Sequence, residues 1–124
     1  AQDWVAVAHM FLGVPYLWGG RSAAGIDCSA LVQLSRQVAG LACLRDSDMQ
    51  EAAPGEAVGE TDLRRGDLVF WKGHVGIMLS GQQMLHANAH HMAVAIEPLA
   101  RAAQRIEKNG GGPVTSRRRW PGAA

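Results

Sequence analysis

The chain has 124 residues, close to the commonest size of one globular domain and too few for two domains with separate cores. Hydrophobic residues make up 48% and charged residues 19%, a composition that excludes an intrinsically disordered chain. The formal net charge is only +1, so no global field steers the protein onto nucleic acid or a membrane. No apolar stretch approaches the roughly 20 residues that a membrane-spanning helix needs.

Helical patterns dominate the first half of the chain. Apolar residues at helical spacing predict an amphipathic helix over residues 3–12, ended by Gly13 and Pro15. A glycine-rich connection over residues 14–27 is too irregular to predict a regular element. Residues 46–53 are compatible with a short helix capped by Asp46 or Ser47.

Between these segments the sequence predicts a longer helix. Asp27 is its expected N-cap and Gly40 its C-terminal stop. Leu31, Leu34 and Val38 recur on one face and predict its buried stripe.

The period becomes strand-like after residue 66. Four short segments predict strands, at residues 67–71, 75–79, 83–87 and 92–96. Because only a few residues separate them, an antiparallel meander is the most economical arrangement. Residues 99–108 have the composition of a helix and residues 114–120 that of a last strand. The chain is therefore predicted to be one α+β domain, with N-terminal helices packed on an antiparallel sheet.

Cys28 is the residue most suggestive of chemistry. It follows the predicted N-cap Asp27, so it lies in the first helical turn, where free backbone amides and the helix dipole favour an anion. A thiol there is predicted to have a pKa lowered toward the reactive thiolate. The alternative, an inert buried cysteine, fits Cys43 better, because its neighbours Ala42 and Leu44 are apolar.

A nucleophilic cysteine needs a base, and the base needs an orienting partner. His74 begins a predicted strand directly after Gly73, and His86 lies 12 residues further on, in the next predicted strand. A tight turn near residues 80–81 would bring the two histidines nearly opposite each other, whereas a slip of one residue would put them on different faces. Two unrelated, half-buried histidines remain the alternative.

Other cofactor and ligand patterns are weak. His86, His90 and His91 are rich in ligand atoms, but the spacing of the first two suits a helix rather than a strand and loop, and no glutamate accompanies them as in H-E-x-x-H. His90 and His91 are therefore expected to form a polar turn, and no metal is predicted. The glycine clusters fit neither the dinucleotide nor the P-loop pattern, and the basic run 117–119 alone is a weak nucleic-acid signal. No cofactor and no nucleic-acid partner are expected.

Four stretches together resemble the NlpC-type family of bacterial cell-wall cysteine peptidases. They are Pro15 to Gly20, Gly25 to Val32, Arg65 to Trp71, and His74 to Leu79 with Leu85-His86-Ala87. Each stretch alone is weak, but together they follow the family's order over most of the domain.

The resemblance implies a papain-like fold, with the nucleophile at a helix N-terminus packed on the antiparallel sheet. It implies hydrolysis of γ-D-glutamyl–diamino acid amide bonds in peptidoglycan stem peptides. Carried over by position, Cys28 is the nucleophile, His74 the general base and His86 the residue that orients it. Tyr16 corresponds to a tyrosine that stabilises the oxyanion or holds substrate, although a core tyrosine is the plain alternative.

The segment Arg45-Asp46-Ser47 resembles the branch of the family that trims stem peptides with a free N-terminal L-alanine. In that branch this segment and Asp27-Cys28-Ser29 line the substrate-binding side. Asp27 would pair with the α-ammonium, and Arg45 or Ser47 with a carboxylate. Helix capping is the structural alternative for Asp27, Asp46 and Ser47.

The relatives in that branch carry N-terminal SH3-like domains that close the substrate pocket. We therefore expect residues 1–124 to be one peptidase domain excised from a longer protein, where it would pack against such a domain. Recycling of free peptides would place the protein in the cytoplasm, and wall remodelling would place it outside, so the sequence leaves the compartment open. Two alternatives remain: another cysteine amidohydrolase or acyltransferase on the same fold, and a non-catalytic peptidoglycan-binding module.

Overall fold

The computed structural model describes residues 3–17, 20–22, 25–41, 43, 45–52, 55–88 and 90–120. Trp18 and Gly19, in the first stretch of the family resemblance, and residue 53 of the predicted third helix lie outside these ranges. None of the helices within these ranges is long and apolar enough to cross a membrane.

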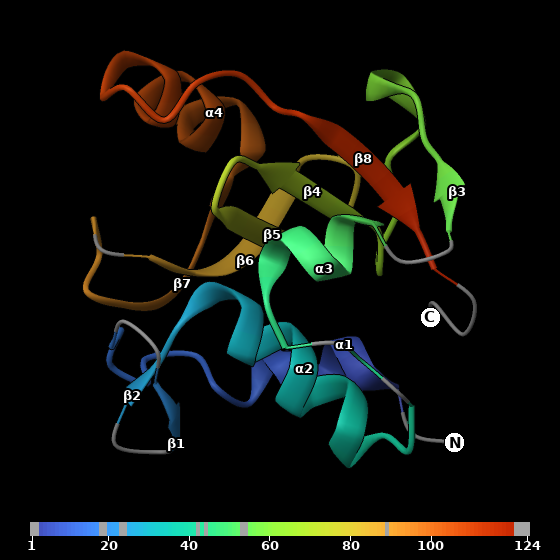
Figure 1. Cartoon of the computed structure of the whole chain (residues 1–124), viewed down its shortest axis with the longest axis vertical. Coiled ribbons are helices and arrows are strands. Elements are labelled where there is room, and N and C mark those ends of the chain that lie inside the picture. The colour runs from blue at the N-terminus through green and yellow to red at the C-terminus, as the bar shows by residue number, and fades with distance from the viewer. Residues whose placement is uncertain are drawn as a thin grey trace.

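Within the described ranges, a six-stranded antiparallel sheet lies between helices (Figure 1). The chain passes through α1 (Trp4–His9), α2 (Cys28–Val38) and α3 (Ser47–Ala52) before the main strands begin. The predicted meander is present as β4 (Leu68–Trp71), β5 (His74–Met78), β6 (Gln83–Asn88) and β7 (Ala93–Pro98). Helix α4 (Leu99–Lys108) and strand β8 (Ser116–Arg119) complete the predicted elements, and the α+β prediction is confirmed. The sheet order is β3-β8-β4-β5-β6-β7.

The first helix is shorter than predicted. Asp3 caps it, since the Asp3 carboxylate accepts hydrogen bonds from the backbone N–H groups of Val5 and Ala6 at 3.1 and 3.3 Å. The helix ends at His9 rather than at residue 12. Beyond His9 the backbone forms turns whose hydrogen bonds join residues three apart. The N–H of Gly13 donates to the carbonyl of Val94 in β7 and not to a residue of the helix.

Helix α2 begins and ends where the sequence predicts. The Asp27 carboxylate accepts from the Ala30 N–H at 2.7 Å, and Gly40, with φ of +84°, follows its last turn. The predicted stripe is only partly correct: Leu31 is buried, but Val38 is 62% exposed. The reason is tertiary, because α2 packs against α1, α3 and the sheet, which buries a wider face that includes the polar residues Ser29, Gln33, Ser35 and Arg36.

Three two-residue strands were not predicted. Within the glycine-rich connection, β1 (Arg21–Ser22) and β2 (Gly25–Ile26) pair antiparallel, and β3 (Glu56–Ala57) pairs with β8 before a short 3₁₀ helix over Glu60–Asp62. Strands this short carry no alternation that a sequence pattern could reveal.

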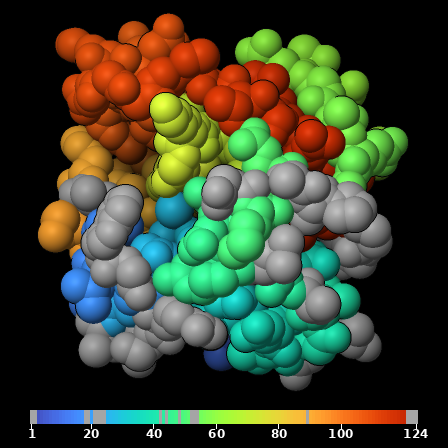
Figure 2. Space-filling model, in the orientation of Figure 1, coloured from blue at the N-terminus to red at the C-terminus, as the bar shows by residue number. Residues whose placement is uncertain are grey.

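The two faces of the sheet bury different clusters. Cross-strand pairs Leu68–Ile77, Leu85–Ile96 and Ala87–Val94 point to the α1–α2 side and form the larger core there. Residues of opposite parity, such as Val69, Trp71, Met78 and Met84, face the other side and pack against α4. Figure 2 shows α4 and β8 gathered at one end of the molecule and the N-terminal helices at the other.

The arginine run in β8 has a structural use. Arg119 donates from Nε and Nη2 to the two carboxylate oxygens of Asp67, each at 2.8 Å, and the Asp67 side chain is 1% exposed. Asp67 also accepts from the Arg64 N–H at 2.8 Å. This ion pair ties β8 to the start of β4.

Candidate active site

Cys28 is the first residue of α2 and lies against the turn that joins β4 to β5. Its Sγ is 3.9 Å from the carbonyl oxygen of Gly73, and the backbone N–H of Val75 also bonds to the thiol. Gly73 has φ of +76°, a conformation that L side chains rarely adopt, so the turn depends on glycine here. The thiol thus contacts the backbone on both sides of His74.

The electrostatic prediction for Cys28 was wrong. The residue is only 8% exposed, and burial raises the pKa of its thiol to about 11, although the N–H groups of Val75, Ser29 and Cys28 itself act to lower it. Desolvation therefore outweighs the helix N-terminus. The free site holds a neutral thiol rather than a thiolate.

His74 and His86 meet on the face of the sheet that also packs against α4. The Nε2 atom of His74 is 2.8 Å from Nδ1 of His86, and the two rings meet edge to face with centroids 5.0 Å apart. The pairs Ile77–Leu85 and Met78–Met84 set the register of β5 on β6. That register puts both histidines on one face, as the sequence predicts for the correct alignment.

The imidazole of His74 is neutral at ordinary pH. Burial is the main cause that lowers the pKa of His74 to about 3, and the neighbouring His86 and Arg105 also disfavour a positive charge there. A neutral imidazole has one nitrogen lone pair and can therefore accept a proton.

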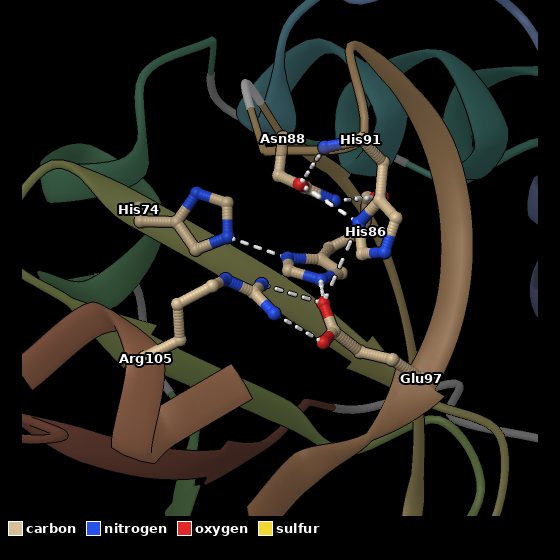
Figure 3. A network of polar contacts seen from close by, with 6 residues as sticks. All are labelled: His74, His86, Asn88, His91, Glu97 and Arg105. Carbon is tan, nitrogen blue, oxygen red and sulfur yellow. Dashed lines mark hydrogen bonds and ion pairs between the residues drawn. The ribbon is translucent and has the colours of Figure 1, made fainter. Parts of the chain in front are cut away.

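Two residues behind His86 were not predicted from the sequence. The Oε2 atom of Glu97, in β7, is 2.6 Å from Nε2 of His86. Arg105, in α4, donates from its two terminal nitrogens to the two oxygens of Glu97, at 2.7 and 2.8 Å. Figure 3 shows His74, His86, Glu97 and Arg105 joined in one chain of contacts. A lone carboxylate in the apolar segment 93–98 was the only sequence signal for this network.

A cavity of about 260 Å³ opens beside Cys28. Its walls contain all six residues predicted to bind substrate or the oxyanion: Tyr16, Asp27, Ser29, Arg45, Asp46 and Ser47. Gly73 completes the lining, so the cavity reaches the turn that carries His74.

Asp27, Ser29 and Arg45 form a bonded group at this cavity. Arg45 donates to Oδ1 and Oδ2 of Asp27, at 3.1 and 2.9 Å, and to Oγ of Ser29 at 2.8 Å. Oγ of Ser29 in turn donates to Oδ1 of Asp27 at 3.2 Å. Among the described residues, Oδ1 accepts from Arg45, Ser29 and the Ala30 N–H, whereas Oδ2 accepts from Arg45 alone. Asp27 is therefore both the helix cap and a charged wall of the cavity.

A second cavity, of about 280 Å³, lies on the histidine side. It is lined by Tyr16, Trp71, Lys72, His74, His86, Asn88, His90, Arg105, Ile106, Asn109 and Gly111. Tyr16 lines both cavities, so its ring stands where they adjoin. Burial raises the pKa of Tyr16, with a further increase from the nearby Cys28 and Asp27. The phenol is protonated and can donate a hydrogen bond.

One set of potential metal ligands is present in the described part of the chain. Ligand atoms of His86, His91 and Glu97 lie within 4.8 Å of one another. The guanidinium of Arg105 already bonds both oxygens of Glu97, so a metal ion would have to displace this guanidinium. His90 and His91 lie in the turn before β7, as predicted.

Comparison with known proteins places these features in a family. The sequence profile described as "NlpC/P60 family" matches residues 13–106. The γ-D-glutamyl-L-lysine dipeptidyl-peptidase of Bacillus subtilis (strain 168) is 39% identical over 95 residues, which cover 70% of this chain and 32% of that protein.

Two solved structures are similar throughout. An NlpC/P60 family protein from Bacillus cereus has a TM-score of 0.77 at 31% identity, with 95% of this chain and 39% of that chain covered. The NlpC/p60 domain of the peptidoglycan hydrolase SagA has a TM-score of 0.75 at 30% identity, with 94% and 95% covered. The chain spans about a third of the length of the curated relatives it matches: it covers 32% of each of three dipeptidyl-peptidases, including the one from Bacillus subtilis.

Proposed function

The chain belongs to the NlpC/P60 family, and we propose that it is a cysteine peptidase that hydrolyses γ-D-glutamyl–diamino acid bonds in peptidoglycan stem peptides. The observation that carries this proposal is the placement of the Cys28 thiol against the backbone on both sides of His74, at the mouth of a polar cavity. A binding module that had lost catalysis would have no need of a thiol and an imidazole in this arrangement.

In the proposed mechanism Cys28 is the nucleophile, His74 the general base and His86 the residue that orients it. Because thiol and imidazole both start neutral, His74 takes the thiol proton as sulfur attacks the amide carbonyl. Carbon–sulfur bond formation pushes the carbonyl electron pair onto oxygen. The backbone N–H of Cys28 and the Tyr16 hydroxyl are suited to donate to this oxyanion.

The second half of the reaction returns the proton. His74 protonates the leaving amine as the carbon–nitrogen bond breaks, which leaves a thioester on Cys28. His74 then removes a proton from water, whose oxygen attacks the thioester. The peptide leaves as a carboxylic acid and the thiol regains its proton. The proposed mechanism needs no cofactor.

Charges in the first cavity support a substrate with a free N-terminus. Within the part of the chain that the structure describes, Oδ2 of Asp27 accepts only from Arg45, and it has a further lone pair for an α-ammonium while Oδ1 continues to cap α2. Arg45 and Ser47 lie on the same wall and can meet a substrate carboxylate. We further propose that the domain works beside an SH3-like domain of a longer protein, which would close this cavity.

Mass spectrometry of reaction products tests the proposal. The protein is incubated with L-Ala-γ-D-Glu-diaminopimelate and with its N-blocked muramyl counterpart, alongside the variants Cys28→Ala and Cys43→Ala. Cleavage after D-glutamate of the free peptide alone would identify a dipeptidyl-peptidase of peptide recycling, in the cytoplasm. Cleavage of both would identify a wall endopeptidase that works outside the cytoplasm.

The two cysteine variants decide the chemistry. Cys28→Ala is expected to abolish turnover, and Cys43→Ala, which removes the other cysteine of the sequence, is expected to retain it. Hydrolysis by Cys28→Ala, or no cleavage of either peptide by the unaltered full-length protein, would overturn the proposal.

A further inference from the structure

The chain of contacts in Figure 3 continues past the histidine pair to a buried ion pair. His86 is fully buried, at 0% exposure, and Glu97 is 8% exposed. Four elements supply the chain: His74 from β5, His86 from β6, Glu97 from β7 and Arg105 from α4. The proposed reaction uses only the first two, which leaves the buried carboxylate and its arginine without an assigned role.

The donors and acceptors along this chain have a fixed direction. A guanidinium can only donate hydrogen bonds, and an ionised carboxylate can only accept them. Burial by itself would raise the pKa of Glu97, but hydrogen bonds from Arg105 and His86 hold that pKa well below its usual range, so Glu97 is ionised. The nitrogen of His86 that faces Glu97 at 2.6 Å must therefore carry a hydrogen.

The direction then passes from ring to ring. Burial lowers the pKa of His86, so its ring is neutral and carries one hydrogen, on Nε2. Its Nδ1 has only a lone pair, and the 2.8 Å contact with His74 requires the hydrogen to sit on Nε2 of His74. The basic lone pair of His74 is then on Nδ1, the nitrogen that points away from His86 in Figure 3.

We propose that Glu97 and Arg105 are positioning residues that fix His74 in the tautomer whose free lone pair is on Nδ1. The inference rests on the proposed function in one respect: this lone pair is the one that serves the Cys28 thiol. Both residues act through the histidine pair and not on the reacting atoms. Glu97 sets the polarity of the hydrogen-bond chain, and Arg105 occupies both carboxylate oxygens so that the carboxylate stays ionised and cannot rotate.

Other groups that face Glu97 fit this assignment. The Nδ1 atom of His91 is 3.8 Å from Oε2 of Glu97, too long for a hydrogen bond, and lies 3.0 Å from Oδ1 of Asn88. Asn88 also accepts from the His91 N–H at 2.9 Å. His91 is therefore held by Asn88 rather than by the carboxylate, which leaves Oε2 to His86 and Arg105.

The variant Glu97→Gln reverses the direction of the hydrogen bonds between His74, His86 and residue 97, with almost no change in side-chain shape. An amide offers one oxygen. Because a guanidinium can only donate, this oxygen accepts from Arg105, and the amide nitrogen then donates to Nε2 of His86. His86 must shift its hydrogen to Nδ1, and His74 must shift its own to the nitrogen that should accept the thiol proton. In triads of this kind, exchange of the orienting carboxylate for an amide lowers kcat by about 10⁴-fold. With one more ring in between, we expect a loss of about 10²- to 10⁴-fold in kcat with KM nearly unchanged.

A second substitution distinguishes control of the hydrogen-bond direction by Glu97 and Arg105 from a purely structural role of these residues. In Glu97→Gln/Arg105→Met the amide oxygen is free to turn and accept from His86, which restores the original direction. The double variant is therefore expected to be at least about tenfold more active than Glu97→Gln. A purely structural role predicts the opposite, because the double variant loses more contacts. Glu107→Gln, the same exchange at an exposed site on α4, is the matched control and should leave kcat unchanged.

The tautomers are also measured directly, without turnover. Imidazole ¹⁵N chemical shifts of the unaltered protein, assigned with His74→Gln and His86→Gln, distinguish a hydrogen on Nε2 from one on Nδ1. We expect Nε2–H for both rings in the unaltered protein and Nδ1–H for both in Glu97→Gln. The opposite tautomer of His74 in the unaltered protein, or a double variant less active than Glu97→Gln, would overturn the inference. If the peptides are not cleaved but the tautomers are as stated, the proposed function fails while the positioning by Glu97 and Arg105 stands.

Discussion

Asp27 has two proposed tasks, and the variant Asp27→Asn separates them. Asparagine caps a helix about as well as aspartate, so its oxygen can keep the 2.7 Å bond from the Ala30 N–H. The negative charge, which the proposal assigns to the substrate ammonium, is lost. Asp27→Ala, in contrast, removes the cap and the charge together.

The structure sets the expected magnitudes. A hydrogen bond to a charged group contributes about 1.5–3 kcal/mol, so Asp27→Asn should lower kcat/KM for the free peptide by roughly 10- to 150-fold. The Arg45–Asp27 pair has side chains 22% and 15% exposed, and its loss should lower the free energy of unfolding by about 1–2 kcal/mol. Asp27→Ala should cost a further 0.5–2 kcal/mol or so, the usual value of an N-cap. For a domain of this size each kcal/mol corresponds to roughly 3–6 °C in Tm.

Two assays are needed, on the same three proteins. Hydrolysis of L-Ala-γ-D-Glu-diaminopimelate is compared with hydrolysis of its N-acetylated form, and thermal unfolding is followed by circular dichroism. Only the free peptide should be affected by Asp27→Asn, since the acetylated form has no ammonium to lose. An equal fall in kcat/KM for both peptides would refute the assignment, because it would mean that Asp27 acts through Arg45 or the helix rather than on the substrate amine.

Two further predictions follow from the geometry. Because burial raises the pKa of Cys28 to about 11, its alkylation by iodoacetamide should accelerate about tenfold per pH unit between pH 7 and 9. The modified Cys28 peptide is quantified by mass spectrometry, because burial also raises the pKa of the Cys43 thiol to about 11 and the two cysteines must be measured separately. A rate that stops rising below pH 8 would show that Cys28 is already a thiolate. Gly76→Ala would place a methyl group against Sδ of Met84 and 2.8 Å from its Cγ. The free energy of unfolding should therefore fall by about 1–3 kcal/mol. An unchanged Tm for Gly76→Ala would show that the Met84 side chain has free space that the structure does not reveal.

The fold was largely predictable because its determinants are local. Capping by Asp27, the stop at Gly40 and the short connections of the meander all act between residues near in sequence. The prediction was wrong where neighbours far along the chain decide the outcome. Helix α1 ends early because Gly13 bonds to Val94, and Val38 is exposed because α2 buries a different face than its apolar stripe indicates.

The sequence also pointed to Cys28, at a predicted helix start, and to His74 and His86, which lie in neighbouring predicted strands and match the family resemblance. Their chemistry depends on the tertiary structure. Whether a helix N-terminus or desolvation controls the Cys28 pKa is decided by how much of the chain covers the thiol, and burial prevails. Glu97 and Arg105 could not be joined to His86 from the sequence, because a strand register and the docking of a helix on a sheet together set that contact. Spacing along the chain determines which side chains share a face, whereas only packing determines which of their atoms meet and in what dielectric.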